Sequence, residues 1–106
     1  MIKKTPAGIP TLATLNKYGL TREMFMDITA RQHGVCPICE KHPNGHWCID
    51  HEHVKGWKKL LWKERSQYVR GVVCWFCNHY YLGKAITVTK AQNVVNYLQV
   101  YQTKGQ

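Results

Sequence analysis

Two pairs of cysteines constrain the fold of this chain more than any other feature. Each pair has CxxC spacing, one at Cys36 and Cys39 and the other at Cys74 and Cys77, and 34 residues separate the pairs. Each tight CxxC turn presents two sulfur atoms, so the four thiolates can bind one tetrahedral zinc ion. Disulfide or redox chemistry is the alternative. The fifth cysteine, Cys48, has no partner in this pattern and is expected to be a small buried residue.

A zinc site of this kind would stabilise the whole fold. The chain has 106 residues, which is room for one domain with a modest core, so burial alone stabilises it only marginally. Binding of zinc to comparable sites contributes roughly 10–16 kcal/mol, and this energy appears as folding free energy. We therefore expect the metal-free protein to be poorly folded.

The chain is strongly basic. It has 15 Lys and Arg residues against 6 Asp and Glu, a formal net charge of +9. Such a charge on a small domain usually indicates a polyanionic partner, here DNA, although a cationic surface that serves only solubility is the alternative. Positive residues concentrate just after the middle of the chain, where only Glu64 opposes them. The candidate DNA-binding residues are Lys55, Lys58, Lys59, Lys63, Arg65 and Arg70.

Tryptophans alternate with lysines in the same stretch. Trp57 and Trp62 flank an apolar Leu-Leu pair, in a pattern that fits either a strand and loop or an irregular helix. Such rings can stack on bases or sugars of a nucleic acid. They can equally be core residues covered by the stems of lysine side chains.

Compartment and membrane association follow from the apolar pattern. No apolar run follows the first lysines, as a signal peptide would require, and no segment approaches the ~20 apolar residues that span a bilayer. Thiols bind metal rather than oxidise in a reducing compartment. We therefore expect a cytoplasmic protein without a membrane partner.

We expect residues 1–10 to be a flexible arm and residues 11–106 to form a single domain. Within it, a helical part spans residues 11–34, the zinc-binding core spans residues 35–84, and a C-terminal helix spans residues 87–103. These boundaries follow the positions of glycine, proline and helix-capping residues.

Local signals predict the elements of the core. Thr21 is the expected N-cap of the second helix, and Gly34 its stop. We expect residues 47–49 to form a strand that leads into Asp50 and His51, and residues 69–73 to form a second strand. A helix that packs on both strands is expected to start within residues 78–82.

The final helix has an apolar stripe. Thr89 and Gln92 match a capping box. The residues of the stripe are Val94, Val95, Leu98 and Tyr101. The stripe is expected to be ordinary core in preference to a dimer surface.

Chemistry-bearing residues stand between and beside the cysteine pairs. Hydrolysis of a phosphodiester needs a base for the attacking water and a cation that stabilises charge on the phosphoryl oxygens. His51 suits the base, Asp50 and Asn78 offer the hard oxygen ligands that Mg²⁺ prefers, and His53 could donate to a phosphate oxygen. Because Asn78 follows Cys77 directly, zinc would fix its distance from the Asp-His pair. We interpret this order as a nuclease site on a zinc scaffold.

The residues that carry this order also resemble a known family. The matching segments are Tyr-Gly-Leu-Thr at 18–21, Gln-His-Gly-Val-Cys-Pro-Ile-Cys at 32–39, Asp-His-Glu-His at 50–53, Arg-Gly-Val-Val-Cys-Trp-Phe-Cys-Asn at 70–78 and Leu-Gly at 82–83. Together they closely resemble the recombination endonuclease VII family, HNH-type nucleases that are common in phages. The resemblance covers roughly residues 15–101.

The resemblance implies a fold and roles for particular residues. The implied fold is small and α+β: a zinc-stabilised ββα-metal core, HNH or treble-clef-like, flanked by N-terminal and C-terminal helices. The family pattern places structural zinc on the four paired cysteines and a catalytic Mg²⁺ or Mn²⁺ on Asp50 and Asn78. It makes His51 the general base and His53 a phosphate or leaving-group contact. It also implies nicks with 5′-phosphate and 3′-hydroxyl ends, made in the cytoplasm of a bacterial host.

The chain departs from the junction-resolving member of the family in three places. The segment between His53 and Arg70 is longer and richer in Lys and Trp, which suggests an altered DNA grip. The resolvase has a carboxylate shortly after its asparagine, whereas this chain has His79, Tyr80 and Tyr81 there. His79 could ligate the catalytic metal or simply lie on a helix surface. Little chain remains for a long intertwined dimer region, so paired cuts across a junction are not expected, and a smaller homodimer through the last helix stays open.

These observations predict a metal-dependent DNA endonuclease that nicks or resolves branched or duplex DNA. The alternative is a non-catalytic zinc module that binds nucleic acid or a nuclease partner. The joint presence of Asp50, His51 and Asn78 favours the nuclease, because a pure binding module has no chemical use for all three.

Overall fold

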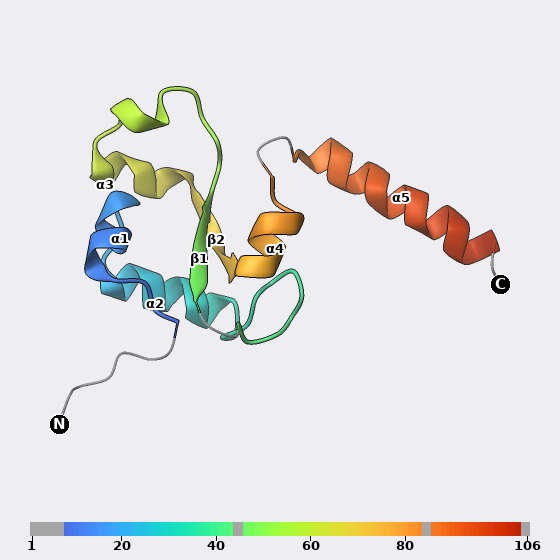
Figure 1. The fold of residues 1–106 in the computed structure, drawn as a ribbon, viewed down its shortest axis with the longest axis horizontal. Helices are drawn as coiled ribbons and strands as arrows, with labels where there is room; N and C mark the ends of the chain where they lie inside the picture. The colour runs from blue at the N-terminus through green and yellow to red at the C-terminus, as the bar shows by residue number, and fades with distance from the viewer. Residues whose placement is uncertain (1–7, 44–45, 84–85, 105–106) are drawn as a thin grey trace.

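The computed structural model of the chain describes residues 8–43, 46–83 and 86–104 (Figure 1). Its elements are α1 (Leu12–Lys17), α2 (Arg22–Arg31), β1 (Trp47–His51), the 3₁₀ turn η1 (Trp57–Lys59), α3 (Trp62–Arg65), the 3₁₀ turn η2 (Ser66–Tyr68), β2 (Val69–Cys74), α4 (Trp75–Tyr80) and α5 (Val88–Lys104). The predicted small α+β fold, a ββα core between flanking helices, is confirmed. Most of the expected N-terminal arm lies outside the described residues.

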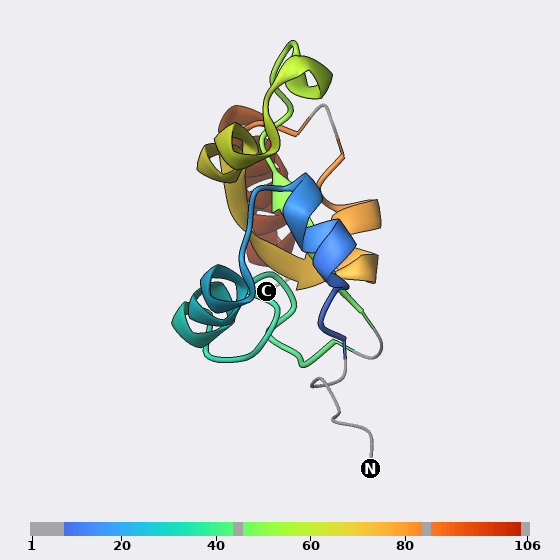
Figure 2. The same cartoon turned by 90° about the vertical axis from the view of Figure 1, so that its left-hand side faces the viewer.

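The centre of the molecule is an antiparallel hairpin of β1 and β2. The register pairs Trp47 with Cys74 at one end and His51 with Val69 at the other, with an irregularity between Asp50 and His51. Viewed from the side of α1, the hairpin lies behind that helix, and α2 and α4 occupy opposite sides of it (Figure 2). Because α4 follows β2 directly and packs on both strands, the arrangement is ββα.

Hydroxyl caps and a left-handed glycine define the N-terminal helices. The Thr11 hydroxyl accepts a hydrogen bond from the Thr14 N–H at 3.3 Å, and the Thr21 hydroxyl accepts one from the Met24 N–H at 3.1 Å. Gly34 has a φ of 74° and its N–H donates to the Thr29 carbonyl at 2.8 Å, which satisfies a carbonyl at the end of α2. The predicted cap and stop of the second helix are therefore confirmed.

The core fills the space between the two N-terminal helices and the hairpin. It combines apolar helix residues with inward residues of the strands and two cysteines. Its buried members are Leu15, Leu20, Phe25, Cys36, Trp47, Ile49, Val72, Val73 and Cys77. Since cysteines of both CxxC pairs belong to this core, the zinc-binding region and the hairpin form one packed unit.

The stretch between the strands is an irregular run of short helices. Of the two predicted forms, the irregular helix is therefore confirmed and the strand and loop is not. The first turn of α3 is closed by the Leu61 N–H, which donates to the Glu64 carboxylate at 2.9 Å. Trp57 is half-buried, whereas the Trp62 side chain is 53% exposed. The two tryptophans therefore have different environments.

The last two helices correct two boundaries. The helix predicted from Asn78 begins instead at Trp75, because the Cys74 sulfur accepts a hydrogen bond from the Cys77 N–H at 3.4 Å and so caps α4. At α5, the Thr87 hydroxyl accepts from the Lys90 N–H at 3.1 Å. The capping residue is thus Thr87 rather than the predicted Thr89.

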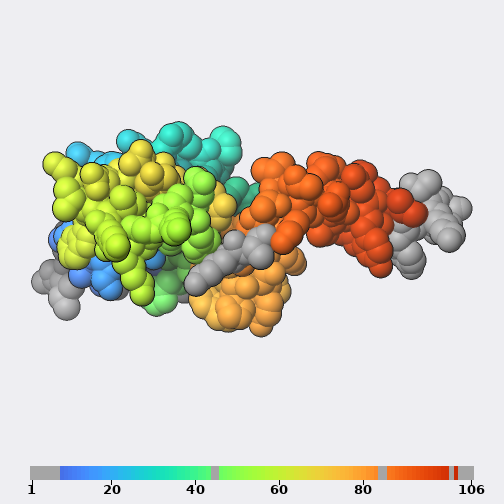
Figure 3. Space-filling model, turned by 90° about the horizontal axis from the view of Figure 1, so that it is seen from above, coloured from blue at the N-terminus to red at the C-terminus, as the bar shows by residue number. Residues whose placement is uncertain are grey.

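The apolar stripe of α5 was expected to be core, but three of its four side chains are exposed; the side chain of the fourth, Tyr101, lies outside the described part of the structure. Val94, Val95 and Leu98 are 54%, 44% and 56% exposed. The helix projects away from the rest of the molecule, so none of the described elements covers this face (Figures 1 and 3). Along the described residues, no helix combines the length and the apolar character that crossing a membrane requires.

Candidate active site

One end of the hairpin brings the four paired cysteines together. The sulfur atoms of Cys36, Cys39, Cys74 and Cys77 all lie within 4.8 Å of one another, and those of Cys39 and Cys74 are 3.8 Å apart. Tetrahedral zinc with Zn–S bonds of about 2.3 Å requires sulfur atoms about 3.8 Å apart. The donor set and its geometry therefore fit a structural zinc ion, as predicted.

Protonation of the cluster reflects its partly buried position. Burial tends to raise the pKa of Cys36, but backbone N–H groups, including those of Cys39 and Cys74, more than offset it and lower the pKa to about 7. Burial, followed by the neighbouring Cys74 sulfur, raises the pKa of Cys77. Cys48 stands outside the cluster, half-buried, and burial raises its pKa. The lowered pKa of Cys36 favours loss of its proton to an incoming metal at neutral pH.

The other end of the hairpin contains a bidentate ion pair. Asp50 is 6% exposed, and its Oδ2 and Oδ1 atoms accept hydrogen bonds from the Nε and a terminal nitrogen of Arg70 at 2.7 and 2.9 Å. These hydrogen bonds raise the pKa of Arg70. Such a pair compensates the burial of the carboxylate, because an unpaired buried charge is destabilising.

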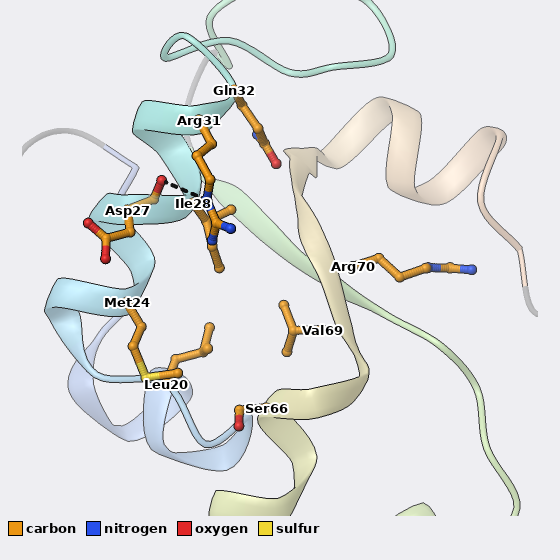
Figure 4. A pocket seen from close by; sticks show the side chains of 9 residues that line it. All are labelled: Leu20, Met24, Asp27, Ile28, Arg31, Gln32, Ser66, Val69 and Arg70. Carbon is orange, nitrogen blue, oxygen red and sulfur yellow. Dashed lines mark hydrogen bonds between the residues drawn. The ribbon is translucent and has the colours of Figure 1, made fainter.

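Alternation along β2 places Arg70 on the face of the active site. A cavity between α2, η2 and β2 lies on one side of the strand, and Val69 points into it (Figure 4). The Arg70 side chain extends away from α2 in the same view, toward the opposite side of β2. Successive residues of a strand point to opposite faces. Because Val69 points toward α2, Arg70 points to the other face of β2, where it pairs with Asp50.

Gln32, at the end of α2, fixes the position of β2. Its amide oxygen accepts from the Val72 N–H at 3.0 Å, and its amide nitrogen donates to the Val72 carbonyl at 2.8 Å. A Cβ atom on Gly71 would lie 2.7 Å from the Gln32 Oε1, so only glycine leaves room for this contact. Sequence reasoning missed Gln32, since a glutamine after a helix gives no signal for a partner 40 residues away.

The predicted catalytic residues meet at a single cavity. The cavity has a volume of about 280 Å³ and is lined by Tyr18, Ile49, Asp50, His51, His53, Asn78, His79, Leu82 and Gly83. All four residues predicted to be catalytic are included, and so is the possible metal ligand His79. The imidazole of His79 also stacks on Trp75, with ring centroids 4.6 Å apart and planes 9° apart.

The donors present fit a hard divalent cation at this cavity. Asp50 and Asn78 contribute oxygen atoms, and Mg²⁺ is commonly bound by one or two protein oxygen ligands with water and phosphate in the remaining positions. Both Asp50 oxygens are already engaged by Arg70. A cation at this carboxylate would therefore share it with the guanidinium or displace it.

Aromatic rings surround His51. The Trp57 ring is 3.9 Å from it at an interplanar angle of 18°, the His53 ring is 4.7 Å away, and the Tyr18 ring is 5.5 Å away. Tyr18 and Trp57 were not among the predicted site residues. The alternation of Trp and Lys in the sequence was the only signal for Trp57, and it left two readings open.

The environment of His51 favours its neutral form. Burial is the largest influence that lowers its pKa, followed by the charge of His53, and Arg70 and Arg65 act in the same direction. Asp50 opposes them. An imidazole with a lowered pKa is unprotonated at neutral pH, which is the state that accepts a proton from water.

The basic residues of the segment 55–70 fall into two groups. Lys55, Lys58, Lys59 and Lys63 are exposed and free to meet a polyanion. Arg65 is half-buried: one terminal nitrogen donates to the Lys17 carbonyl at 3.0 Å, and its guanidinium carbon lies 5.0 Å from the centre of the Trp57 ring. DNA contact by these residues and by Arg70 stays a prediction, and both arginines have structural partners in addition.

These features describe a small ββα protein with a zinc-binding cysteine cluster, in which β1 presents Asp50 and His51 and α4 presents Asn78 at one cavity. Comparison with known families specifies it further. The family model for recombination endonuclease VII matches residues 12–100, and the chain belongs to this family.

A curated relative comes from a phage. The Gene 59 protein of Mycobacterium phage D29 is 34% identical over 89 residues, which cover 80% of this chain and 47% of that protein. The chain thus spans about half the length of this relative. No solved structure matches the chain.

Proposed function

We propose that this protein is a metal-dependent, HNH-type endonuclease that hydrolyses phosphodiester bonds in DNA. The observation that carries the proposal is the cavity shared by Asp50, His51, His53 and Asn78, on a hairpin whose other end has the four-cysteine cluster. Membership of the recombination endonuclease VII family supports it. The substrate would be branched or duplex DNA, and the products would have 5′-phosphate and 3′-hydroxyl ends.

Each residue has a role that its surroundings support. His51 accepts the proton of the attacking water, which the lowered pKa of its imidazole permits. Asp50 and Asn78 hold the divalent cation, Mg²⁺ or Mn²⁺, and His79 is a further candidate ligand. When bound, the cation stabilises negative charge on the phosphoryl oxygens. His53, with its ring 4.7 Å from that of His51, donates to a phosphate or to the leaving oxygen.

Binding of DNA would use the basic segment beside the cavity. The four exposed lysines of residues 55–63 would neutralise phosphates. Arg70 pairs with Asp50 here, and it could contact a phosphate instead if Asp50 served as a metal ligand. Arg65 contributes positive potential from its half-buried position. Such binding is sequence-independent and weakens steeply as salt increases.

We also propose an oligomeric state and a cellular location for the protein. A homodimer through α5 would bury the exposed Val94, Val95 and Leu98, which the single chain leaves uncovered. A phage-encoded enzyme of this kind would act on DNA in the cytoplasm of a bacterial host, and the phage relative supports this assignment.

One observation favours a second candidate function. Arg70 occupies both oxygens of Asp50 at 2.7 and 2.9 Å, which is how a module without a catalytic cation would stabilise that carboxylate. In this case the protein is a non-catalytic zinc module that binds nucleic acid or a nuclease partner.

The test compares cleavage and binding in the same proteins. Supercoiled plasmid and a synthetic four-way junction are incubated with Mg²⁺ or EDTA and with wild type, His51→Ala or His46→Ala, the last a control at an exposed histidine. We expect Mg²⁺-dependent cleavage by wild type and by the control, and none by His51→Ala, with DNA binding retained in all three. Equal binding without cleavage under any divalent metal would establish the binding module instead.

A further inference from the structure

The ring of His51 is oriented by packing rather than by a hydrogen bond. Among the hydrogen bonds between described residues, none involves this imidazole. Among the described aromatic rings, the nearest is that of Trp57, which lies nearly parallel to it, with centroids 3.9 Å apart and planes 18° apart. Tyr18 and His53 approach at 5.5 and 4.7 Å in tilted orientations. A face-to-face contact of this kind restricts rotation of the imidazole, because turning it would lose the overlap with the indole.

Trp57 is itself fixed by contacts from three parts of the chain. Its backbone N–H donates to the Val54 carbonyl at 3.3 Å, and its ring lies 5.9 Å from that of Tyr18, which caps α1. On the indole, the guanidinium carbon of Arg65 lies 5.0 Å from the ring centroid. The indole thus has Tyr18, Arg65 and His51 as neighbours, and a backbone hydrogen bond holds the residue at its start.

Arg65 connects this tryptophan to the rest of the fold. Its terminal nitrogens donate to the Lys17 carbonyl at 3.0 Å and to the Lys58 carbonyl at 3.4 Å. Its Nε atom is buried without a partner. A guanidinium shielded from water in this way interacts more strongly with an aromatic face than an exposed one does.

We propose that Trp57 is a positioning residue that orients the His51 imidazole toward the attacking water, and that Arg65 holds Trp57 in place. The proposal rests on the proposed function, in which His51 is the general base. Trp57 acts through His51 and has no contact with the reacting atoms. The segment between the strands would then serve the catalytic geometry as well as DNA binding.

Removing the indole should reduce turnover more than substrate binding. Loss of orientation at a reacting group can cost up to about 100-fold in rate, so we expect Trp57→Leu to lower kcat by roughly 10- to 100-fold with little change in KM. Trp57→Phe keeps an aromatic face and should recover most of the rate. Arg65→Ala should lower kcat less than Trp57→Leu, because the indole keeps its other neighbours.

The experiment measures the ring contact and the rate separately in zinc-loaded protein. In NMR spectra of wild type, the His51 ring protons should be shifted upfield by the ring current of Trp57. The upfield shift should disappear in Trp57→Leu and be smaller in Trp57→Phe. It should persist in Asn78→Ala, which is expected to lose cleavage but to keep the ring contact. Trp62→Leu is the matched control, because Trp62 is 53% exposed and its ring is not among those packed against His51 in the described residues. Plasmid cleavage by the same proteins gives kcat and KM.

The possible outcomes separate the two proposals. Cleavage by wild type with an unchanged kcat in folded, zinc-containing Trp57→Leu overturns the positioning role and leaves the nuclease intact. A rise in KM alone would make Trp57 a DNA contact and also overturn it. His51 signals that do not respond to Trp57→Leu would show that the stack is absent in solution. If wild type cleaves no DNA with any divalent metal, the proposed function and this inference fail together.

Discussion

The two ends of the β1–β2 hairpin are held by different means. At the end where Trp47 pairs with Cys74, four sulfur atoms within 4.8 Å of one another form a metal site. At the other end, Asp50 and His51 depend on an ion pair with Arg70 and on a ring stack with Trp57. Metal–thiolate bonds are strong and local, whereas the contacts at the catalytic end are individually weak and come from distant segments. Under the proposed function, stability and activity therefore depend on opposite ends of the hairpin, and each can be perturbed separately.

The largest effect is expected at the zinc end. Cys77→Ser removes one ligand, and since zinc binding contributes roughly 10–16 kcal/mol against a total stability of about 5–15 kcal/mol for small domains, the protein should unfold. Circular dichroism and measurement of bound zinc test this. Cys48→Ser is the matched control, because Cys48 lies outside the cluster, and it should keep both zinc and fold. A folded Cys77→Ser protein would contradict the comparison.

A pair of glycines tests how the scaffold under the catalytic end is packed. Gly19 and Gly34 have nearly equal φ angles of 72° and 74°, but a Cβ on Gly19 would collide with the Trp62 carbonyl oxygen, whereas nothing lies within 4 Å of one on Gly34. Gly34→Ala should cost about 1 kcal/mol for the left-handed backbone, and Gly19→Ala roughly 3 kcal/mol because overpacking is added. Denaturant unfolding of both zinc-loaded variants measures the difference. Equal losses would show that α1 is not packed on α3 in solution.

The ion pair at the catalytic end should matter less for folding. Arg70→Ala leaves the Asp50 carboxylate, 8% exposed, without its partner, but the arginine side chain is 40% exposed and the interaction is partly screened. We expect a loss of about 1–2 kcal/mol with bound zinc unchanged. Arg31→Ala, at an exposed arginine on α2, should cost under about 0.5 kcal/mol. Loss of zinc from Arg70→Ala would mean that the two ends are not independent.

The smallest predicted effect is a shift in pH dependence. Burial and the charge of His53 lower the pKa of His51, and only its neutral form is a base. Cleavage should therefore fall only below about pH 6.5, the ordinary pKa of histidine. Removing a nearby positive charge favours protonation, so His53→Gln should move this acidic limb to higher pH. Single-turnover rates at fixed Mg²⁺ and salt, measured across pH, locate the pH at which cleavage falls. A fall centred well above pH 6.5 in wild type would contradict the assignment of His51 as the base.

The zinc end was predictable because its signals are local. Each CxxC pair lies within one turn, and threonine caps and a terminal glycine mark the second helix within a few residues. The order of Asp50, His51 and Asn78 around those cysteines also indicated which residues would meet at one cavity. These patterns depend on short spacings that any reader of the sequence can measure.

The supports of the catalytic end were not predictable for the opposite reason. Gln32 reaches Val72 across 40 residues, and Arg65 reaches the Lys17 carbonyl across 48. No spacing rule indicates such contacts. The start of α4 was misplaced because Cys74 acts as a helix cap as well as a zinc-site residue. The α5 stripe was assigned to the core, but no element in the described part of the chain covers it.

The central claim is that zinc builds the hairpin while a second cation, on Asp50 and Asn78, serves cleavage. The most direct test measures plasmid cleavage and bound zinc in one sample as Mg²⁺ is removed by dialysis and then restored. We expect cleavage to stop without Mg²⁺ while zinc stays bound. Restoring Mg²⁺ should restore cleavage in wild type but not in Asn78→Ala. Cleavage that continues at the full rate without Mg²⁺, with zinc as the remaining metal, would contradict this claim.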